Sequence, residues 1–452
     1  MSITFEELKH AVASGSIDTV LVCMVDMQGR LMGKRYHGDF FVRYGYEETH
    51  ACNYLLANDM EMQPVPGYTG TSWAHGYGDF LLKPDLSTLR CLPWLDASAM
   101  VICDVFDHQG KAVAHSPRQI LQRQLQRLAD RGMRACFASE LEFYLFDETY
   151  QSLLAKKYSC PQTFGSYNQD YNILSTTQQE SVMRPLRNGL HGAGITIECT
   201  KGEGGAGQGE INVYYADPLL MADHHTIIKH ASKEIAAQHG KAVTYMAKWN
   251  HDLAGSSSHI HASLWSPEGR PLFYDNNFPH GMSKLMQQYL GGLLKYSRDI
   301  TLFLAPYINS YKRFQTDTFA PTKIAWSHDN RTVGYRVCGE GSKAARVECR
   351  IGGADLNPYL AFAGLIAAGL AGIEEQLDLP GLFVGDAYRD PELPEIPKTL
   401  RNASDISSNS RWLHEVLGRE IVDHYVHAAR WEQSEFDRCV TDWELTRGFE
   451  RG

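Results

Sequence analysis

The chain of 452 residues contains 43% hydrophobic and 21% charged residues and has a formal net charge of −10. This composition is typical of a soluble globular protein, and the length predicts two domains, because domains cluster at roughly 100–200 residues. The acidic balance and the scattered basic residues argue against a nucleic-acid partner.

The cysteines and the chain start indicate where the protein works. Ten cysteines are spread along the chain without a CxxC pair, which is typical of buried free thiols in a reducing compartment. We find no basic segment followed by an apolar run at the N-terminus, so we expect no signal peptide. The longest apolar stretch, 359–373, is shorter than the ~20 residues of a membrane span. We therefore expect a cytoplasmic protein without a membrane partner, and an internal helix at 359–373.

Residues 1–112 are predicted to form a small α+β domain. Thr4 is a candidate cap for a helix whose apolar positions begin at Phe5. Strands at 19–25 and 31–34 are expected to form a hairpin, and 100–106 a further strand. Between them lies 62–78, a loop rich in Gly, Pro, Tyr and Trp that is too long for a simple connector and is therefore a candidate functional loop.

The second domain, 113–452, is predicted to begin with a helix at Ser116-Pro117, because serine suits the N-cap and proline suits the first helical position. Helices then alternate with strands rich in Val, Ile and aromatic residues. The expected strands are 135–146, 210–215, 243–248, 259–265, 332–337 and 346–351. The expected helices are 180–193, 219–239, 283–304, 357–376 and 411–440.

A Glu-Leu-Glu segment lies in the strand predicted at 135–146. Side chains at alternate strand positions share a face, so Glu140 and Glu142 should point the same way while Leu141 and Phe143 point into the core. Two acids on one face repel each other unless a cation or solvent lies between them. The pair marks either a solvated strand face or a cation site, and its apolar flanks favour the cation site.

Two further segments offer candidate metal ligands. Glu203 and Glu210 flank a glycine-rich turn whose backbone can approach a ligand closely, although a flexible surface loop could have the same composition. His259 and His261 share a strand face, where one can ligate a metal and the other can face phosphate, or both can be ordinary core histidines. Hard divalent ions take oxygen ligands with an occasional nitrogen and often share them with phosphate groups.

Basic residues near the last strands are suited to anionic substrates. Arg346, Glu348 and Arg350 alternate in one predicted strand, so all three should share a face. Guanidinium forks match carboxylates and phosphates, although an arginine taken singly is usually a surface group. The other members of this set are Arg313, Arg331 and Arg336. We find no Walker A, dinucleotide-binding or Gly-x-Ser-x-Gly motif, so any ATP must be held by metal ions, arginines and glycine-rich backbone.

Taken in order, these segments resemble the glutamine synthetase superfamily over essentially the whole chain. The motifs are Glu-x-Glu (140–142), Gly-Gln-x-Glu (207–210), His-x-His (259–261), Asn-Ser-Tyr-Lys-Arg (309–313), Asn-Arg-Thr (330–332), Arg-x-Glu-x-Arg (346–350) and Asn-Pro-Tyr-Leu (357–360). The resemblance implies an α+β fold with an N-terminal β-grasp domain and a catalytic domain built on a curved antiparallel sheet. It also implies self-association into rings, commonly dodecamers of two stacked hexamers, with each active site between neighbouring subunits.

The resemblance also implies that each site binds about two or three Mg²⁺ or Mn²⁺ ions, and it assigns roles to individual residues. The expected ligands of the first ion, near the glutamate carboxylate, are Glu142, Glu203 and Glu210. The expected ligands of the second ion, on the nucleotide phosphates, are Glu140, His259 and Glu348. The expected ATP contacts are His261, Ser263, Arg336, Lys343 and Arg346. The expected glutamate contacts are Gly255, Arg313 and Arg350, and Arg331 is expected to stabilise the transferring phosphoryl group.

Two acids of the ammonia-using relatives have no counterpart in this chain. Those enzymes carry a Gly-Tyr-Glu-Ala-Pro flap whose glutamate binds ammonium, whereas here the segment 316–321 has Phe319 at that position. A second ammonium-site acid, contributed by a neighbouring subunit, should fall near 65–68, which has no acid. The loss of both acids, with Tyr68 and Trp73 nearby, predicts an apolar pocket for an alkyl or aryl group on the nitrogen.

We therefore predict an ATP-dependent ligase that joins the γ-carboxylate of L-glutamate to a primary monoamine through γ-glutamyl phosphate. Ethanolamine, isopropylamine and aniline are candidate amines, and Arg313, Phe319 and Arg331 are the residues expected beside the reacting groups. One alternative is a polyamine ligase, for which Glu61 or Asp317 could hold the second ammonium. Another is an ammonia-using glutamine synthetase with a remodelled flap. A non-enzymatic relative is disfavoured because all the expected metal ligands are present.

Overall fold

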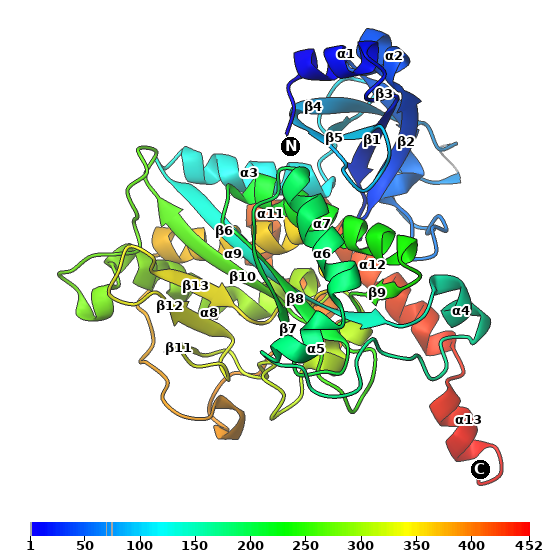
Figure 1. The fold of residues 1–452 in the computed structure, drawn as a ribbon. Coiled ribbons are helices and arrows are strands. Elements are labelled where there is room, and N and C mark those ends of the chain that lie inside the picture. The colour runs from blue at the N-terminus through cyan, green and yellow to red at the C-terminus, as the bar shows by residue number, and fades with distance from the viewer. Residues whose placement is uncertain (1, 69, 74–75) are drawn as a thin grey trace.

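The computed structural model describes residues 2–68, 70–73 and 76–452, which form a five-stranded sheet near the N-terminus and an eight-stranded sheet beyond it (Figure 1). The strands are β1 (Thr19–Val25), β2 (Leu31–His37), β3 (Thr49–Cys52), β4 (Asp79–Cys91), β5 (Ser98–Phe106), β6 (Arg134–Phe146), β7 (Ile197–Gly202), β8 (Gln208–Val213), β9 (Ala242–Thr244), β10 (Ser258–Trp265), β11 (Trp326–His328), β12 (Tyr335–Cys338) and β13 (Arg346–Cys349). The helices are α1 (Phe5–Ala13), α2 (Gly38–Phe40), α3 (Pro117–Ala129), α4 (Tyr150–Ala155), α5 (Ile173–Thr177), α6 (Glu180–Gly192), α7 (Pro218–Gln238), α8 (Lys284–Leu304), α9 (Pro358–Glu374), α10 (Leu400–Asn409), α11 (Arg411–Leu417), α12 (Arg419–Arg438) and α13 (Asp442–Gly448).

The five-stranded sheet has the order β2-β1-β5-β4-β3, with β1 and β5 parallel and its other described pairs antiparallel. Helix α1 begins as predicted, because the Thr4 hydroxyl accepts from the Glu7 backbone and the Glu7 carboxylate accepts from the Thr4 backbone. Strand β4 escaped prediction, because Pro84 interrupts its pattern and its pairing with β5 shifts register between Asp85 and Arg90. The domain boundary near 112 stays a prediction; it falls between β5 and α3.

The eight-stranded sheet has the order β11-β12-β13-β10-β6-β8-β7, with β9 beside β6. Its described pairs are antiparallel, as predicted, except that β11 and β12 are parallel. One face packs against helices: Phe137 of β6 lies 5.0 Å from Phe362 of α9 between ring centroids, and Leu141 and Phe143 are buried. The opposite face carries the ionisable residues of β6, β8, β10 and β13. The sheet of this α+β fold therefore has one apolar face and one polar face.

Helices α8 and α9 form the centre of the helical layer. Nearly all of α9 is buried, which confirms the predicted internal helix, and no helix in the described parts of the chain is long and apolar enough to span a membrane. The two helices approach closely at a pair of glycines: a Cβ on Gly292 would lie 2.1 Å from the Ala368 carbonyl oxygen, and one on Gly372 would lie 2.1 Å from that of Gln288. Only glycine fits such contacts.

Several predicted elements have other bounds in the structure; the strand expected at 243–248, for example, is only β9, Ala242–Thr244. The helix expected at 411–440 is divided into α11 and α12 at Gly418, whose φ of 99° is incompatible with a continuous helix. The strand expected at 332–337 begins only at Tyr335, because the Asn330 side chain accepts from the Thr332 backbone and hydroxyl and so holds a local turn.

Buried polar contacts join the five-stranded sheet to helices α3, α7 and α9. The Arg118 side chain in α3 is 3% exposed and binds Asp85 of β4 at 2.7 Å, Asp104 of β5 at 2.5 Å and Asp223 of α7 at 3.3 Å. Asn357, the N-cap of α9, donates to the backbone oxygen of Met27 in the β1–β2 turn at 3.0 Å. The β1–β2 hairpin is therefore held against the start of the central helix.

Replacement of Arg118 by alanine should lower the free energy of unfolding by about 3–5 kcal/mol, because it leaves the buried Asp223 without its charged partner. Urea denaturation of the purified protein measures this. The control is Arg127→Ala on the same helix, whose ion pair with Glu374 is partly exposed and should contribute only about 0–1 kcal/mol. Equal losses in the two variants would contradict the account.

Candidate active site

The charged face of the eight-stranded sheet forms the floor of a cleft with a volume of about 1110 Å³. This is large enough for a nucleotide together with a small substrate. The predicted site residues that line it are Glu140, Glu142, Glu203, Glu210, His259, His261, Ser263, Phe319, Arg331, Arg336, Lys343, Arg346, Glu348 and Arg350. Segments separated by up to 210 positions in the chain, from 140 to 350, thus meet in one cavity.

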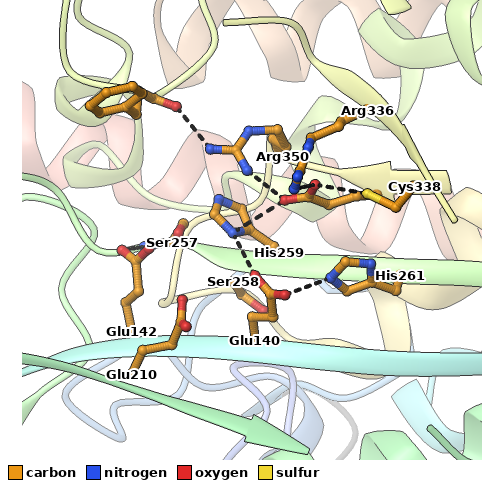
Figure 2. Close-up of polar contacts among 12 residues, drawn as sticks. Glu140, Glu142, Glu210, Ser257, Ser258, His259, His261, Arg336, Cys338 and Arg350 are labelled. Carbon is orange, nitrogen blue, oxygen red and sulfur yellow. Dashed lines mark hydrogen bonds and ion pairs between the residues drawn. The ribbon is translucent and has the colours of Figure 1, made fainter. Parts of the chain in front are cut away.

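Strand register brings the ionisable side chains together. Cross-strand partners have Cβ atoms only ≈ 4.5–5.5 Å apart on the same face. Figure 2 shows side chains from neighbouring strands converging above the sheet. The paired positions are His259 with Glu140, Glu142 with Glu210, His261 with Glu348, and Arg336 with Glu348.

Glu142, Glu203 and Glu210 form an acidic cluster at one end of the cleft, with one carboxylate oxygen from each within 4.8 Å of the others. Burial and then the charge of Glu142 raise the pKa of Glu210 to about 8. Burial and then the charge of Glu203 raise the pKa of Glu142 to about 7. Like charges at this distance oppose one another's ionisation, and Lys201, which binds Glu203, offsets part of that repulsion.

The Glu142 carboxylate is held in position by uncharged donors. It accepts from the Ser257 backbone N–H at 2.7 Å and from the Gln208 side-chain amide at 3.3 Å (Figure 2 draws the Ser257 contact). The same Gln208 amide also donates to the Gly255 backbone oxygen at 3.0 Å. These contacts fix the direction of the carboxylate without neutralising its charge.

Glu140, His259, His261 and Glu348 form a second cluster, in which imidazoles alternate with carboxylates. His259 Nδ1 lies 3.2 Å from Glu140 and 3.5 Å from Glu348, and His261 Nε2 lies 2.8 Å from the other Glu140 oxygen. Burial alone would raise the pKa of Glu140, but hydrogen bonds from both histidines bring it well below its usual value. Burial lowers the pKa of His259 to about 4, which favours the neutral, ligating imidazole.

Arginines neutralise the Glu348 end of the cleft. The Glu348 carboxylate binds Arg350 Nη1 at 2.5 Å and Arg336 Nη1 at 2.8 Å. Although burial opposes ionisation, Arg350 and His259 bring the pKa of Glu348 to about 2. Arg346 donates through Nε to His261 Nδ1 at 3.1 Å. The cleft is therefore acidic at one end and basic at the other, a polarity suited to a metal-bound polyphosphate.

The two clusters fit divalent cations by their donor chemistry. Carboxylate oxygens and an imidazole nitrogen are ligands that Mg²⁺ and Mn²⁺ accept. The raised pKa values of Glu142 and Glu210 indicate buried acids whose charges the nearby Arg313 and Lys201 do not fully offset. A cation among them would supply the missing charge.

Comparisons with known proteins identify the family. Residues 114–448 match the family model described as glutamine synthetase, catalytic domain. The chain belongs to the glutamine synthetase family.

Several members of this family are similar over nearly their full length. The chain is 47% identical over 447 residues to a gamma-glutamylethanolamide synthetase of Streptomyces coelicolor, covering 99% of this chain and 96% of that protein. It is 34% identical over 444 residues to a glutamate–isopropylamine ligase of a Pseudomonas species, covering 98% and 97%. Its fold superposes on the solved structure of ligand-free GmaS with a TM-score of 0.86 at 25% identity, covering 100% of both chains.

Four of the predicted site residues are not among the described residues that line the cleft: Gly255, Arg313, Tyr68 and Trp73. Arg313 is 3% exposed and donates to the backbone oxygens of Arg350 and Ile351 at 2.9 and 3.0 Å, and the Gly255 backbone oxygen accepts from Gln208. Tyr68 is buried in its own chain, with its ring 4.4 Å from that of His424. Trp73 is 80% exposed. The roles assigned to these four residues stay predictions.

Sequence reasoning missed several residues of the cleft. Lys201 on β7 binds Glu203, contacts Asp170 at 3.0 Å, and lies 4.3 Å above the Tyr171 ring. Its position two residues before Glu203 on a strand was the available signal, because alternate residues share a face. Strand β7 itself was not predicted, so this signal was lost. Gln208, by contrast, lay inside a recognised motif but was given no role.

Replacement of Glu210 by glutamine should raise the stability of the metal-free protein, because it removes one charge from a mutually repelling cluster. The same change should weaken Mg²⁺ binding by about 100-fold or more, since even partners of metal ligands contribute 10–100-fold. Thermal unfolding with and without Mg²⁺ measures both effects. Glu348→Ala is the opposite control and should lose about 3–5 kcal/mol, because Arg336 and Arg350 lose their partner. Destabilisation by Glu210→Gln would contradict this reading.

The stabilisation that Mg²⁺ confers should increase with pH. The pKa values of Glu142 (about 7) and Glu210 (about 8) are raised above the unfolded value of 4.5, so the metal-free protein loses stability as pH rises through this window. Mg²⁺ binds the deprotonated carboxylates and reverses the loss. The difference in Tm between Mg²⁺ and chelator should therefore be larger at about pH 8.5 than at about pH 6. A difference that is constant or falls over this range would refute the assignment.

Proposed function

We propose that the protein is a glutamate–amine ligase that uses ATP to join the γ-carboxylate of L-glutamate to a primary monoamine. An oxygen of the γ-carboxylate attacks the terminal phosphorus of ATP, and the bond to ADP breaks. The neutral amine nitrogen then attacks the carbonyl carbon of γ-glutamyl phosphate, phosphate leaves, and the nitrogen loses a proton. The products are a γ-glutamylamide, ADP and phosphate.

The observation that carries this proposal is the charge pattern of the cleft. The acidic cluster Glu142, Glu203 and Glu210 would hold one divalent ion. Glu140, His259 and Glu348 would hold another, since His259 Nδ1 lies 3.2 Å from Glu140 and 3.5 Å from Glu348; the group of Glu140, His261 and Glu348 and the group of Glu140, Glu210 and His259 overlap with this set. These ions supply positive charge against the phosphoryl oxygens when bound. Divalent ions and ATP are general requirements of ligases in this family.

The chain's own cations occupy the rest of the cleft. Arg331, Arg336, Lys343 and Arg346 line it from the segment 331–346, where a nucleotide polyphosphate would meet them. Arg350 lies deeper, between Glu348 and the Phe319 backbone oxygen, which it contacts at 2.5 and 3.4 Å. In this arrangement Arg350 orients the glutamate substrate, Arg331 stabilises the transferring phosphoryl group, and Arg313 supports Arg350 from below.

Phe319 supports a monoamine as the nucleophile. Its side chain is 66% exposed within the cleft, and its backbone is held in a left-handed conformation with φ of 59° beside Arg350. An exposed phenyl ring at the place where ammonia-using relatives carry a glutamate offers contact to an alkyl group rather than to ammonium. The relatives named for ethanolamide and isopropylamine chemistry agree with this choice.

The polyamine alternative has less support. Asp317, one of the two acids considered for the second ammonium, binds Arg389 with both oxygens at 2.7 and 2.8 Å. Glu61, the other, is not among the described residues that line the cleft. The ammonia-using alternative is disfavoured by Phe319 itself. We also propose that the loop carrying Tyr68 and Trp73 serves a neighbouring subunit's amine pocket in a ring. Trp73 is 80% exposed and is the side chain available for this, whereas Tyr68 packs against His424 and supports the loop.

An amine panel tests the proposed function. Phosphate release is measured with L-glutamate, Mg²⁺ and ATP in the presence of ethanolamine, isopropylamine, aniline, putrescine, spermine or ammonium, and the amide is detected by mass spectrometry. The proposal predicts the highest kcat/KM for a monoamine. Faster turnover of ammonium than of every organic amine would favour a glutamine synthetase, and putrescine or spermine as the best substrate would favour the polyamine ligase.

Replacement of Phe319 by glutamate should lower kcat/KM for alkyl and aryl monoamines by roughly 10–200-fold, the range expected when an apolar contact is lost. It should also increase the relative use of ammonium. Phe319→Leu is the matched control, because it keeps an apolar side chain at the same position and should retain monoamine selectivity. Unchanged selectivity in Phe319→Glu would exclude Phe319 from the amine pocket.

A further inference from the structure

Besides the two clusters in the active-site cleft, a further group of side chains that commonly ligate metals lies outside it. His280 comes from the short helical turn Pro279–Gly281 before α8, His328 ends β11, and Glu340 lies in the β12–β13 loop. One ligand atom from each lies within 4.8 Å of the others. His280 Nδ1 binds one Glu340 oxygen, and His328 Nδ1 lies 3.4 Å from the other. The three residues are assembled from three separate segments.

Hydrogen bonding within the group does not satisfy all three side chains. His280 and Glu340 form a hydrogen bond with each other, but both ring nitrogens of His328 are buried without a hydrogen-bond partner among the described residues. The two imidazole rings are tilted against each other, with centroids 4.5 Å apart and planes 34° apart, so protonating both would bring like charges together. A metal ion can satisfy two imidazoles and a carboxylate at once.

The backbone brings these residues close at some conformational cost. His280 has a φ of 59°, a left-handed conformation that is uncommon for a residue with a Cβ. The next glycine, Gly281, approaches Gly341 so closely that an added Cβ would lie 3.0 Å from the Gly341 Cα. Gly341 donates its N–H to the His280 carbonyl at 3.0 Å. The turn that carries His280 is therefore docked against the loop that carries Glu340.

The donor set selects the class of ion. Two imidazoles and one carboxylate, with an open position for water, suit Zn²⁺ and neighbouring late transition ions, whereas Mg²⁺ prefers oxygen ligands. The set thus differs in kind from the carboxylate-rich clusters of the cleft.

The location links this group to the nucleotide end of the cleft. Lys343, Ala344 and Ala345, from the same loop as Glu340, line the cleft. On the other side, His328 precedes Asp329, whose carboxylate accepts from Arg336 Nε at 3.1 Å. An ion bound here would restrain both segments.

We propose that His280, His328 and Glu340 bind one late transition ion of the Zn²⁺ class, and that this ion fixes the β12–β13 loop against the turn before α8. The site is separate from the Mg²⁺ clusters and holds the loop that presents Lys343 to the cleft.

Zinc stoichiometry tests the site directly. The full chain is stripped with a chelator, dialysed against Zn²⁺ in a large excess of Mg²⁺, and assayed for zinc by atomic emission. His280→Gln and Glu340→Gln are chosen because both side chains are about half exposed and their loss should not prevent folding. His230→Gln is the matched control, since His230 pairs with Glu234 at 3.2 Å but belongs to no group of three metal-type side chains in the described parts of the chain.

The wild-type protein and His230→Gln should each hold one more equivalent of zinc than His280→Gln or Glu340→Gln. Zinc should also slow hydrogen exchange of residues 339–345 in the wild type but not in His280→Gln. Equal zinc contents in wild type and His280→Gln would overturn the site, and exchange that zinc leaves unchanged would overturn the linkage to the loop. Neither readout depends on ligase activity.

Discussion

Electrostatic repulsion among buried acids on one face of the central sheet is the constraint that organises this protein. Glu142, Glu203 and Glu210 lie within 4.8 Å of one another, and the pKa of Glu210 is raised to about 8. Such a cluster opposes folding unless protons or cations neutralise it. The surrounding fold compensates: the opposite sheet face is packed on α9, and Arg118 links the five-stranded sheet to α7. The site is thus held in an unfavourable state that a cation relieves.

The two ends of the cleft solve the problem of buried charge in different ways. At one end, Glu348 is neutralised by Arg336 and Arg350, and its pKa falls to about 2. At the other, Glu142 is oriented by a backbone N–H and an amide that leave its charge uncompensated. The Glu348 carboxylate is neutralised by arginines of the chain, whereas the charge of Glu142 is offset only in part, by Arg313, and an added cation would complete its neutralisation. This asymmetry explains how one sheet face can attract both a metal ion and an anionic substrate.

Much of this arrangement was predictable from local patterns. Alternation within β6, β10 and β13 placed Glu140 with Glu142, His259 with His261, and Glu348 between its arginines, because the strand period is two. The order of the motifs then indicated the family. The pattern did not extend to β7, and with it Lys201 was missed. The sequence pattern also could not show that Arg313 donates its hydrogen bonds to backbone oxygens or that Tyr68 packs against His424. Both depend on contacts between distant segments.

The group formed by His280, His328 and Glu340 illustrates the same limit. Each residue is isolated in the sequence, and only the parallel pairing of β11 with β12 and the left-handed turn at His280 bring them together. Periodicity within one strand cannot reveal a site of this kind. It requires the tertiary structure, where the loop carrying Lys343 connects it to the nucleotide end of the cleft.

The central claim is that the cleft activates a carboxylate by phosphorylation, and isotope transfer tests it most directly. L-glutamate labelled with oxygen-18 in its γ-carboxylate is incubated with ATP, Mg²⁺ and the preferred amine, and the released phosphate is analysed by mass spectrometry. Attack on γ-glutamyl phosphate leaves one labelled oxygen in the phosphate for each amide formed. Phosphate that contains no label, released while the amide accumulates, would contradict the account.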